Sequence, residues 1–500
     1  MPNLGQIKNL RRYNLEGIVF LCGAVVMVFE LVGSRVMAPY LGTSIFVWTS
    51  LIGVILGSLS LGYYLGGKLA DKNPSLEIFS YIILSSGIFI AFVVLIKDFA
   101  LFYFQNIPSI ELASLVSSLI IFFPASFALG MVSPYVVKLK LSDMAKSGST
   151  VGNLYAISTV GSIFGTFFAG FFLIPLLGSA KILISLSISL ALASLLISKK
   201  NIKIKILLAL ALIAVFISAV YFDNSNRNQG IIDIETKYNR LLIFSALHNE
   251  TGRKIRVLST DNYAWQSAIF LEGEDDLVFG YTKFYRLAGH FAPGLKKSLA
   301  IGGAGYTYPR DYLKKYPSAE MDVVEIDEKM TEAAKKYFRL EESPRLNIYH
   351  EDGRTFLNKT DNNYDVIFGD AFQSLTIPYQ LTTKEAVSKI YGALNDDGVV
   401  MVNIISSIEG KKGKFLRAEY RTFKSVFPQV YLFPVTSDNP EKRQNIILVA
   451  LKSENIPEFK SDNGELDGYL KRIWKGKITE DLPVLTDDFA PVDYYIRELL

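Results

Sequence analysis

The fold of the second half of this chain is decided by residues 298–327, which read SLAIGGAGYTYPRDYLKKYPSAEMDVVEID. Residues 298–301 and 321–326 are short apolar runs of the β type, separated by a glycine-rich turn and a helical segment. This order predicts a strand, a helix and a second strand parallel to the first. Glycines at such a turn let a ligand approach the backbone, and an acidic residue roughly 20 positions later, here Glu325, can accept both hydroxyls of a ribose. The stretch therefore predicts a nucleoside site.

The alternation of strands and helices continues to the end of the chain. We predict strands at 298–301, 321–326, 364–368, 399–404, 430–433 and 446–451, and helices at 312–316, 329–338, 382–394 and 414–426. Strands that alternate with helices indicate a parallel sheet covered on both faces, and ligands bind such sheets beyond the carboxyl ends of the strands. The second half is therefore expected to be a Rossmann-like α/β domain.

Acidic residues follow three successive strand regions. Glu325 ends the second, Asp352 and Gly353 follow the third, and Asp370 follows the fourth. Three carboxylates at one edge of a sheet would form a negative site that suits a cationic sulfonium and an amine that must lose a proton. The same site suits phosphates poorly, which argues against NAD. We expect Asp370 to accept the proton, and the alternative is an Asp that caps a helix.

The composition divides the chain in two. Half of its 500 residues are hydrophobic and 13% are aromatic, which is more apolar material than one water-soluble core of ordinary size requires. The excess lies before residue 222, and the later charge density is that of a globular protein. The domains expected are a transmembrane helical domain at 1–222, a β-rich segment at 223–297 and the Rossmann-like domain at 298–500.

Few residues suit a metal or a nucleic acid. Cys22 is the only cysteine and lies in an apolar run, and the three histidines, His248, His290 and His350, do not have metal-ligand spacing. The net charge of +4 is small, and the basic residues of the second half do not gather on one predicted helix or loop. We therefore expect neither a metal site nor nucleic-acid binding.

The first half contains apolar runs long enough to cross a membrane. About seven runs qualify, at residues 15–37, 44–67, 78–96, 112–137, 151–177, 180–197 and 206–222. The first run is too long for a cleaved signal peptide and contains Glu30, so we expect it to be retained. These features predict a multi-pass protein of the cell inner membrane.

Loop charges predict the orientation. Lysines and arginines concentrate before the first span and after the second, fourth and sixth, namely Lys8, Arg11, Arg12, Lys68, Lys72, Lys138, Lys140, Lys146, Lys199, Lys200, Lys203 and Lys205. The positive-inside rule then places the N-terminus in the cytoplasm. Seven crossings would place the soluble domain outside the cytoplasm, and one span fewer would reverse that side.

Two features of the spans point to helix contacts. Glycines four residues apart (Gly53 with Gly57, Gly62 with Gly66, and Gly161 with Gly165) let helices approach closely, either within one bundle or between the copies of a homodimer. Glu30 lies at membrane depth, where a carboxylate is costly unless it is paired or solvated. Glu30 is expected to be either a structural group or part of a substrate path.

The motifs of the second half resemble the spermidine synthase (aminopropyltransferase) family, and the whole chain resembles its membrane-fused members. The resemblance rests on residues 301–305, 324–327, 351–353 and 364–370, and it extends over nearly all of 254–494. It implies a class I S-adenosylmethionine methyltransferase or spermidine synthase type of fold preceded by a small β segment.

The resemblance also implies roles for individual residues. Glu325 would bind the ribose, Asp352 the adenine, and Asp370 would take the proton from the attacking amine. Further ligand contacts are implied for Gln266 and Tyr281 in the β segment and for Gly302, Gly303, Gly305 and Gly353 around the nucleoside. Homodimers are implied as well, because soluble relatives associate.

The chain departs from the family pattern at three places. Gly305 stands where the family carries an Asp that holds the amine of the donor. The sequence from Tyr281 to Lys283 is Tyr-Thr-Lys, where the family has Tyr-His-Glu. Gln373 stands where a second Asp grips the acceptor diamine. Each change removes a contact with a cationic amine, so recognition of the donor nucleoside is retained better than recognition of a diamine.

The expected activity is therefore a spermidine synthase-like transfer from decarboxylated S-adenosylmethionine, with release of methylthioadenosine. A polyamine such as putrescine is the acceptor in one version, and in the other the amine of the donor attacks its own chain and closes a ring. A membrane-bound methyltransferase that uses S-adenosylmethionine is an alternative from another class of reaction. A polyamine or nucleoside transporter or sensor without catalysis is a third possibility.

Overall fold

The computed structural model describes residues 4–141, 147–198, 200–228, 230–261, 265–273, 275–371 and 377–499. Within these ranges, side chains are described except at 4–14, 215–216 and 219–228. The chain forms two compact units, Met1–Gln229 and Gly230–Leu500. Each unit is described by itself below.

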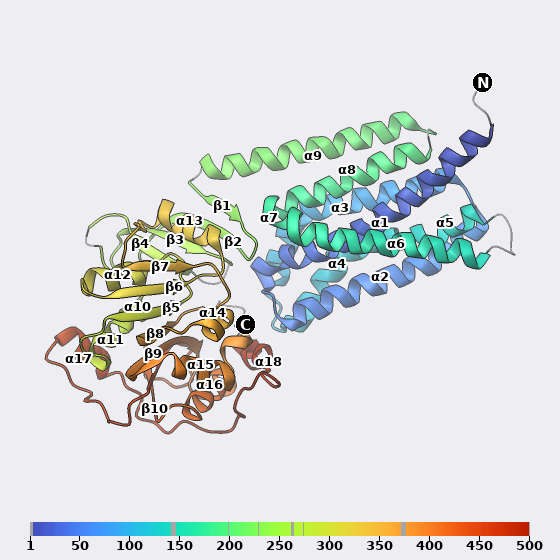
Figure 1. Ribbon diagram of the computed structural model, residues 1–500. Coiled ribbons are helices and arrows are strands. Elements are labelled where there is room, and N and C mark those ends of the chain that lie inside the picture. Colours follow the sequence, from blue (N-terminus) through green and yellow to red (C-terminus); the bar gives the residue numbers. More distant parts are fainter. Residues whose placement is uncertain are drawn as a thin grey trace. The chain divides into compact units, whose positions relative to one another are not determined.

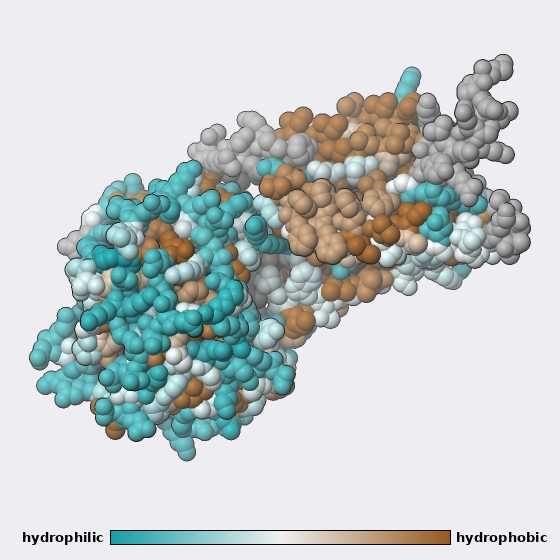
Figure 2. Space-filling model, in the orientation of Figure 1, coloured by the Kyte–Doolittle hydropathy of each residue, from teal (hydrophilic) through white to brown (hydrophobic). Residues whose placement is uncertain are grey.

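The first unit is entirely helical in its described part (Figure 1). Its helices are α1 (Leu4–Leu41), α2 (Ile45–Lys72), α3 (Leu76–Phe104), α4 (Ile110–Gly130), α5 (Val132–Lys140), α6 (Ser147–Phe168), α7 (Ile174–Leu176), α8 (Ser179–Ile197) and α9 (Ile202–Asn228). A short π-helical segment, Ala169–Leu173, joins α6 to α7. Large apolar side chains such as Phe99 (79% exposed) face outward, as expected for helices surrounded by lipid. Figure 2 shows hydrophobic residues over much of the visible face of this unit.

Six helical spans among the described residues are long and apolar enough to cross a membrane. They are Leu15–Leu41, Ile45–Lys72, Leu76–Phe104, Ile110–Lys140, Ser147–Leu176 and Ser179–Ile197. The first six predicted runs coincide with these spans. The seventh, at 206–222, lies in α9, where several side chains fall outside the described residues. The first unit thus has the make-up of a multi-pass membrane domain.

Glycines join two pairs of these helices at very short range. A Cβ at Gly161 or Gly165 of α6 would lie 2.1 or 2.5 Å from a backbone oxygen of α1, and one at Gly62 of α2 would lie 2.3 Å from a backbone oxygen of α4. The stripes at 62–66 and 161–165 therefore serve packing within one bundle. No atom of the described chain lies within 4 Å of a Cβ built at Gly53 or Gly57, so the predicted homodimer stays a prediction.

Glu30 lies near the middle of the span formed by α1 and is partly buried. No hydrogen bond or ion pair joins its carboxyl group to another residue in the described part of the chain. The interpretation of Glu30 as a structural ion pair thus finds no partner among these residues.

The second unit begins with a small antiparallel sheet. Its strands are β1 (Ile232–Glu235), β2 (Arg240–Leu247), β3 (Lys254–Ser259) and β4 (Trp265–Phe270), paired in that order. Leu241 and Ile243 of β2 pack in a core with Met330 and Ala333, whereas Ile255 and Val257 of β3 face a second, smaller core, so apolar residues cover both faces of this sheet. The small N-terminal β segment predicted from the sequence is confirmed.

A seven-stranded sheet forms the body of the second unit. Its strands are β5 (Lys297–Ile301), β6 (Glu320–Val324), β7 (Leu346–Tyr349), β8 (Tyr364–Gly369), β9 (Leu394–Ser406), β10 (Gln429–Pro434) and β11 (Gln444–Leu451). Their order in the sheet is β10-β11-β9-β8-β5-β6-β7. The helices of the unit are α10 (Gly280–Phe284), α11 (Ala288–Phe291), α12 (Thr307–Lys315), α13 (Glu328–Tyr337), α14 (Gly353–Lys359), α15 (Lys384–Gly392), α16 (Lys414–Lys424), α17 (Gly464–Leu470) and α18 (Val492–Ile496).

The predicted parallel sheet needs one correction. The neighbours from β9 to β7 pair in parallel, but β11 is antiparallel to both β9 and β10. A short connection between β10 and β11 forces the chain to reverse, whereas a parallel crossover needs a dozen or more residues. The sheet is therefore mixed, and the Rossmann-like α/β fold with helices on both faces is confirmed.

Side chains of the central strands divide between two apolar cores. Leu299 and Ile301 of β5 join the core under α14, α15, α16 and α18, while Ala300 joins the core under α12 and α13. This alternation is the strand period of two, and it explains why the central strands are apolar throughout. Apolar cores therefore cover both faces of the sheet. The carboxyl edge of the parallel strands remains available for a ligand site.

Candidate active site

The loop between β5 and α12 lies at the centre of this edge. Gly302 has a φ of +98°, and a Cβ there would lie 2.5 Å from the carbonyl oxygen of Asp370. Ala304 and Tyr306 also have positive φ values, +43° and +54°. Such backbone costs about 1–3 kcal/mol at a non-glycine residue and occurs mainly where function requires it. The hydroxyl of Tyr306, 2.7 Å from the hydroxyl of Thr331, helps to hold the loop in this shape.

Glu325 binds this loop directly. Its Oε2 accepts hydrogen bonds from the backbone N–H groups of Gly303 (2.9 Å) and Ala304 (3.0 Å), and its Oε1 accepts one from Asp327 (3.0 Å). Burial raises the pKa of Glu325, and these three backbone N–H groups oppose the rise. A carboxylate has about four acceptor positions, so Glu325 can still accept hydroxyl donors such as those of a ribose.

Asp352 and Gly353 begin α14 on the neighbouring strand end. Asp352 caps the helix, because its Oδ1 accepts a hydrogen bond from the N–H of Thr355 at 2.9 Å. Its Oδ2 is 3.3 Å from the side-chain amide of Gln380. A Cβ at Gly353 would lie 2.6 Å from Cγ2 of Ile301, so this glycine lets α14 approach β5. Asp352 thus has a capping role and keeps acceptor capacity on Oδ2.

Asp370 follows β8 on the other side of the glycine loop. Its Oδ2 accepts a hydrogen bond from the hydroxyl of Tyr281, and its Oδ1 accepts one from the side-chain amide of Asn403, both at 3.1 Å. Burial raises the pKa of Asp370 to about 6, although the side chains of Asn403, Tyr281 and Tyr285 oppose the rise. A carboxylate with such a pKa is ionised at neutral pH and is well matched to accepting a proton.

Tyr285 places a second hydroxyl near Asp370. Its side chain is 1% exposed, and its hydroxyl has no hydrogen-bond partner among the described residues. Burial raises the pKa of Tyr285 well above its ordinary value, and the negative charge of Asp370 raises it further. The ring lies edge-on to Phe368, with the ring centroids 5.2 Å apart. The same hydroxyl acts to lower the pKa of Asp370, so it lies within the electrostatic reach of that carboxylate.

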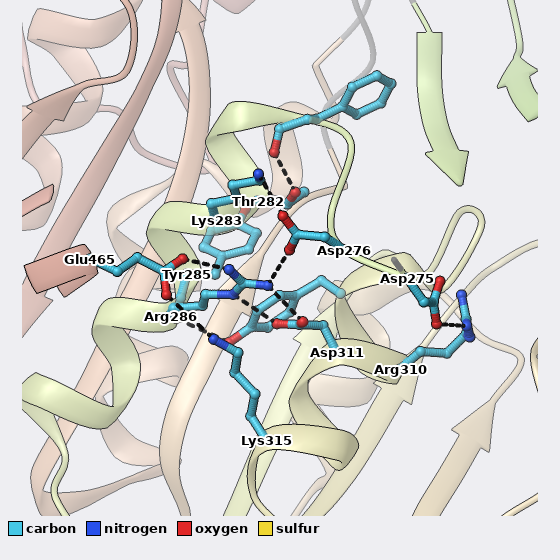
Figure 3. Close-up of polar contacts among 12 residues, drawn as sticks. Asp275, Asp276, Thr282, Lys283, Tyr285, Arg286, Arg310, Asp311, Lys315 and Glu465 are labelled. Atoms are coloured by element: carbon cyan, nitrogen blue, oxygen red, sulfur yellow. Dashed lines mark hydrogen bonds and ion pairs between the residues drawn. The ribbon is translucent and has the colours of Figure 1, made fainter. Parts of the chain in front are cut away.

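A cluster of ion pairs fixes the segment that carries Tyr281 and Tyr285 (Figure 3). Arg286 is 7% exposed, and its guanidinium contacts Asp311 at 2.8 Å, Asp276 at 2.6 Å and Glu465 at 2.5 Å. Lys283 also pairs with Asp276, at 2.8 Å. This Arg286 cluster links the segment to α12 and α17. It thereby helps to fix the position of both tyrosines.

The small sheet contributes Ser267, and not only the predicted Gln266. The hydroxyl of Ser267 accepts a hydrogen bond from the N–H of Gly305 at 2.9 Å, and a Cβ at Gly305 would lie 2.6 Å from Cβ of Ser267. Gln266 is the preceding residue of β4 and is partly exposed. Because side chains alternate along a strand, the two residues lie on opposite faces of β4.

The structure therefore brings together most of the residues that the sequence singled out. Gly302, Gly303, Gly305 and Glu325 form one group, which we call the nucleoside side, with Asp352 at the next strand end. Tyr281 and Asp370 form a second group, the amine side, which also includes Tyr285 and Asn403. Gln373 lies outside the described residues, and the sequence analysis did not identify Tyr285, Asn403 or Ser267.

Comparison with known proteins agrees with this geometry. The model of the spermine/spermidine synthase domain family matches residues 281–463. The matched segment contains the glycine loop, all three strand-end carboxylates and both tyrosines of the amine side. Over residues 281–463 the second unit is thus similar to the spermine/spermidine synthase domain.

Curated proteins similar to this chain are named as polyamine aminopropyltransferases. A probable polyamine aminopropyl transferase of Bifidobacterium longum is 29% identical over 238 residues, which are 43% of this chain and 53% of that protein. A polyamine aminopropyltransferase of Vibrio vulnificus is 24% identical over 294 residues, 55% of this chain and 91% of that protein. The chain thus spans about half the length of the first relative and most of the second.

Solved structures similar to this chain include two described as spermidine synthases. One, a probable spermidine synthase from Corynebacterium glutamicum, is 21% identical, covers 49% of this chain and 88% of its own, and has a TM-score of 0.41. A second, from Thermotoga maritima, is 20% identical, covers 53% of this chain and 84% of its own, and has a TM-score of 0.36.

Proposed function

We propose that the synthase domain of this chain transfers the aminopropyl group of decarboxylated S-adenosylmethionine, with Asp370 as the proton acceptor. The observation that carries the proposal is the surroundings of Asp370. A carboxylate with a pKa raised to about 6 is held by two neutral donors, close to a buried hydroxyl that has no described partner. The carboxylate of Asp370 can therefore accept a hydrogen bond from one more donor, such as a protonated amine.

The donor fits the nucleoside side by the chemistry of its acceptors. Glu325 retains about one acceptor position for a ribose hydroxyl, and Oδ2 of Asp352 keeps the capacity to accept the adenine amino group. The loop N–H groups that would otherwise attract a phosphate are already bonded to Glu325. The site therefore favours a nucleoside that has no phosphate group and carries a cationic sulfur.

The chemical step needs little beyond orientation and one base. The amine nitrogen forms a bond to the propyl carbon attached to sulfur while the C–S bond breaks, and the electron pair of that bond stays on sulfur. Methylthioadenosine leaves as a neutral thioether, and the proton lost by the amine passes to Asp370. Positioning the nucleophile in line and accepting its proton are the contributions of the protein.

One observation favours the cyclising version as a second candidate. Ser267 occupies the space beside Gly305, so this loop position cannot carry a side chain without displacing the small sheet. The family carries at this position the Asp that holds the amine of the donor. Without that anchor, the amine of the donor is free to turn back on its own chain, with Asp370 again taking the proton.

A single assay distinguishes these reactions. The full chain is purified in detergent and given decarboxylated S-adenosylmethionine with and without putrescine, and methylthioadenosine is measured. Release that requires putrescine supports aminopropyl transfer, and release without it supports cyclisation. No release in either case refutes both proposals. Formation of adenosylhomocysteine from S-adenosylmethionine would instead support the methyltransferase.

For the location of the domain we retain the orientation that the loop charges predict. Lysines and arginines before the first apolar run and just after the second favour a cytoplasmic N-terminus. α9 spans 27 residues, which is enough for a seventh crossing. With that crossing the synthase domain lies outside the cytoplasm. Protease added to intact spheroplasts would then cleave the domain, and protection of the domain would overturn this orientation.

A further inference from the structure

Two asparagines on neighbouring strands form a chain of hydrogen bonds that ends at Asp370. The side-chain nitrogen of Asn445 donates to the side-chain oxygen of Asn403 at 2.9 Å, and the side-chain nitrogen of Asn403 donates to Oδ1 of Asp370 at 3.1 Å. Asn403 belongs to β9 and Asn445 to β11, and the antiparallel register places Asn445 opposite Ile405. The two amides are therefore diagonal neighbours on one face of the sheet.

The direction of this chain matters because an amide has one donating end and one accepting end. If the amide of Asn403 were reversed, its oxygen would face the carboxylate of Asp370 and its NH2 group would face the NH2 group of Asn445. Both contacts would then be repulsive. Asn445 thus adds to the preference, set first by the carboxylate, for the orientation in which the NH2 group of Asn403 faces Asp370, although Asn445 does not touch Asp370 through any described contact.

Among the described residues, only neutral side chains donate hydrogen bonds to the carboxylate of Asp370. Tyr281 of α10 donates to Oδ2, Asn403 of β9 donates to Oδ1, and the hydroxyl of Tyr285 is nearby on the turn after α10. Asn403 is 5% exposed, so water does not readily replace its amide. A hydrogen bond to a charged group is stronger than one between neutral groups. The bond from Asn403 should therefore strongly stabilise the ionised carboxylate of Asp370.

We infer that Asn445 and Asn403 form an amide relay that orients the carboxylate of Asp370 and stabilises its ionised form. Both asparagines are positioning residues. Their effect on catalysis rests on the proposed function, in which Asp370 must be ionised before it can accept a proton. The relay itself is a property of the folded chain and can be measured without turnover.

The test is the pH dependence of methylthioadenosine release by the full chain in detergent. In the wild type, kcat/KM is expected to rise with pH through about 6, the pKa of Asp370. Asn403→Leu removes a hydrogen bond to the charged form and should move this limb up by about one to two pH units. Asn445→Leu should move it in the same direction by less, because Asn403 keeps its side chain.

Two further variants sharpen the test. The double variant should show the same shift as Asn403→Leu alone, because Asn445 acts only through Asn403. Asn395→Leu is the control: Asn395 also lies on β9 and donates to a carboxylate of β8, Asp365, at 2.6 Å, but near the amino end of β8. It should leave the limb in place. An unmoved limb in Asn403→Leu, or a full additive shift in the double variant, would overturn the relay.

A second measurement separates this inference from the proposed function. The carbonyl stretch of the protonated Asp370 is followed by infrared difference titration and assigned by its loss in Asp370→Asn. If the wild type releases no methylthioadenosine but the titration moves upward in Asn403→Leu and Asn445→Leu, the proposed function fails and the relay stands. A titration that does not move in either variant refutes the relay, whatever the activity.

Discussion

The nucleoside side and the amine side of the site are built in opposite ways. On the nucleoside side, Glu325 accepts three backbone hydrogen bonds and Asp352 caps a helix. On the amine side, side chains from separate elements surround Asp370, and the hydroxyl of Tyr285 has no described partner. On the first side the backbone fills most acceptor positions before a ligand arrives, whereas on the second side the proposed reacting group would add a contact to Asp370.

This difference predicts which residues should affect substrate binding (KM) and which should affect the chemical step (kcat). Groups already satisfied by the backbone hold the donor equally in the ground state and in the transition state, so their loss should raise KM. Groups that await a partner act on the reacting amine, so their loss should lower kcat. Four substitutions test this division, from the largest expected effect to the smallest.

Asp370→Asn should have the largest effect, because it removes the only base assigned to the reaction. We expect kcat for methylthioadenosine release to fall by roughly 10²- to 10⁴-fold with little change in the KM of the donor. Asp361→Asn, at an exposed position shortly before β8, is the matched control and should be fully active. Retention of more than a tenth of the wild-type rate by Asp370→Asn would contradict the assignment.

Arg286→Met should cause the largest loss of stability. It leaves three carboxylates without their shared, buried guanidinium, and breaking such a cluster costs about 3–5 kcal/mol. Thermal unfolding of the purified chain, followed by circular dichroism, measures the loss. Arg310→Met is the control, because Arg310 pairs with Asp275 at a more exposed site of the same region (Figure 3) and should cost about 1 kcal/mol or less. Equal losses in the two variants would show that the Arg286 cluster is not a special anchor.

Glu325→Gln tests the nucleoside side. Both oxygens of Glu325 accept from backbone N–H groups, so the new NH2 group faces a backbone N–H in either orientation. The glycine loop should loosen, and donor binding should weaken by roughly 10- to 100-fold. The change should appear in the KM of the donor, with kcat altered much less. Glu332→Gln, an exposed position on α13, should leave both constants unchanged. A fall in kcat without a rise in KM in Glu325→Gln would contradict the assignment of this side to donor binding.

Tyr285→Phe should have the smallest effect and the most specific one. Removal of a hydroxyl that awaits a partner should lower kcat by roughly two- to tenfold, the size of one neutral hydrogen bond. The melting temperature should not fall, because the hydroxyl has no described partner in the unliganded fold. Tyr238→Phe, with a side chain on a residue that is 47% exposed, is the control. A lower melting temperature with an unchanged rate would make Tyr285 a structural residue.

The sequence predicted that the residues of the nucleoside side lie together, for a physical reason, and their binding role stays a prediction. These residues lie within short segments, 301–305 and 324–327, where strand, turn and acid follow one another and the parallel fold brings the ends together. Asp370 was predicted by the same pattern. The capping role of Asp352 also has a sequence signal, since an Asp directly before a helical segment is a common N-cap.

The rest of the amine side had no such signal. Asn403 is a single polar residue in an apolar run and Asn445 follows Gln444 at the start of β11, just before the predicted strand at 446–451, and only the antiparallel pairing of β11 with β9 brings them together. The sequence indicated strands there but not the reversal of direction. Tyr285 lies among aromatic residues that look like ordinary core, and its distinctive feature, a hydroxyl without a partner, appears only in three dimensions.

The bonds from the glycine loop to Glu325 also bear on how this protein would behave among the other adenosine compounds of a cell. ATP, NAD and coenzyme A share the adenosine part of the proposed donor, but each carries phosphate. The N–H groups of Gly303 and Ala304, which could grip a phosphate, are instead bonded to a carboxylate. A phosphate brought to this loop would meet a negative charge at close range. Phosphorylated adenosine compounds should therefore compete poorly with the proposed sulfonium donor for this site, on whichever side of the membrane the domain lies.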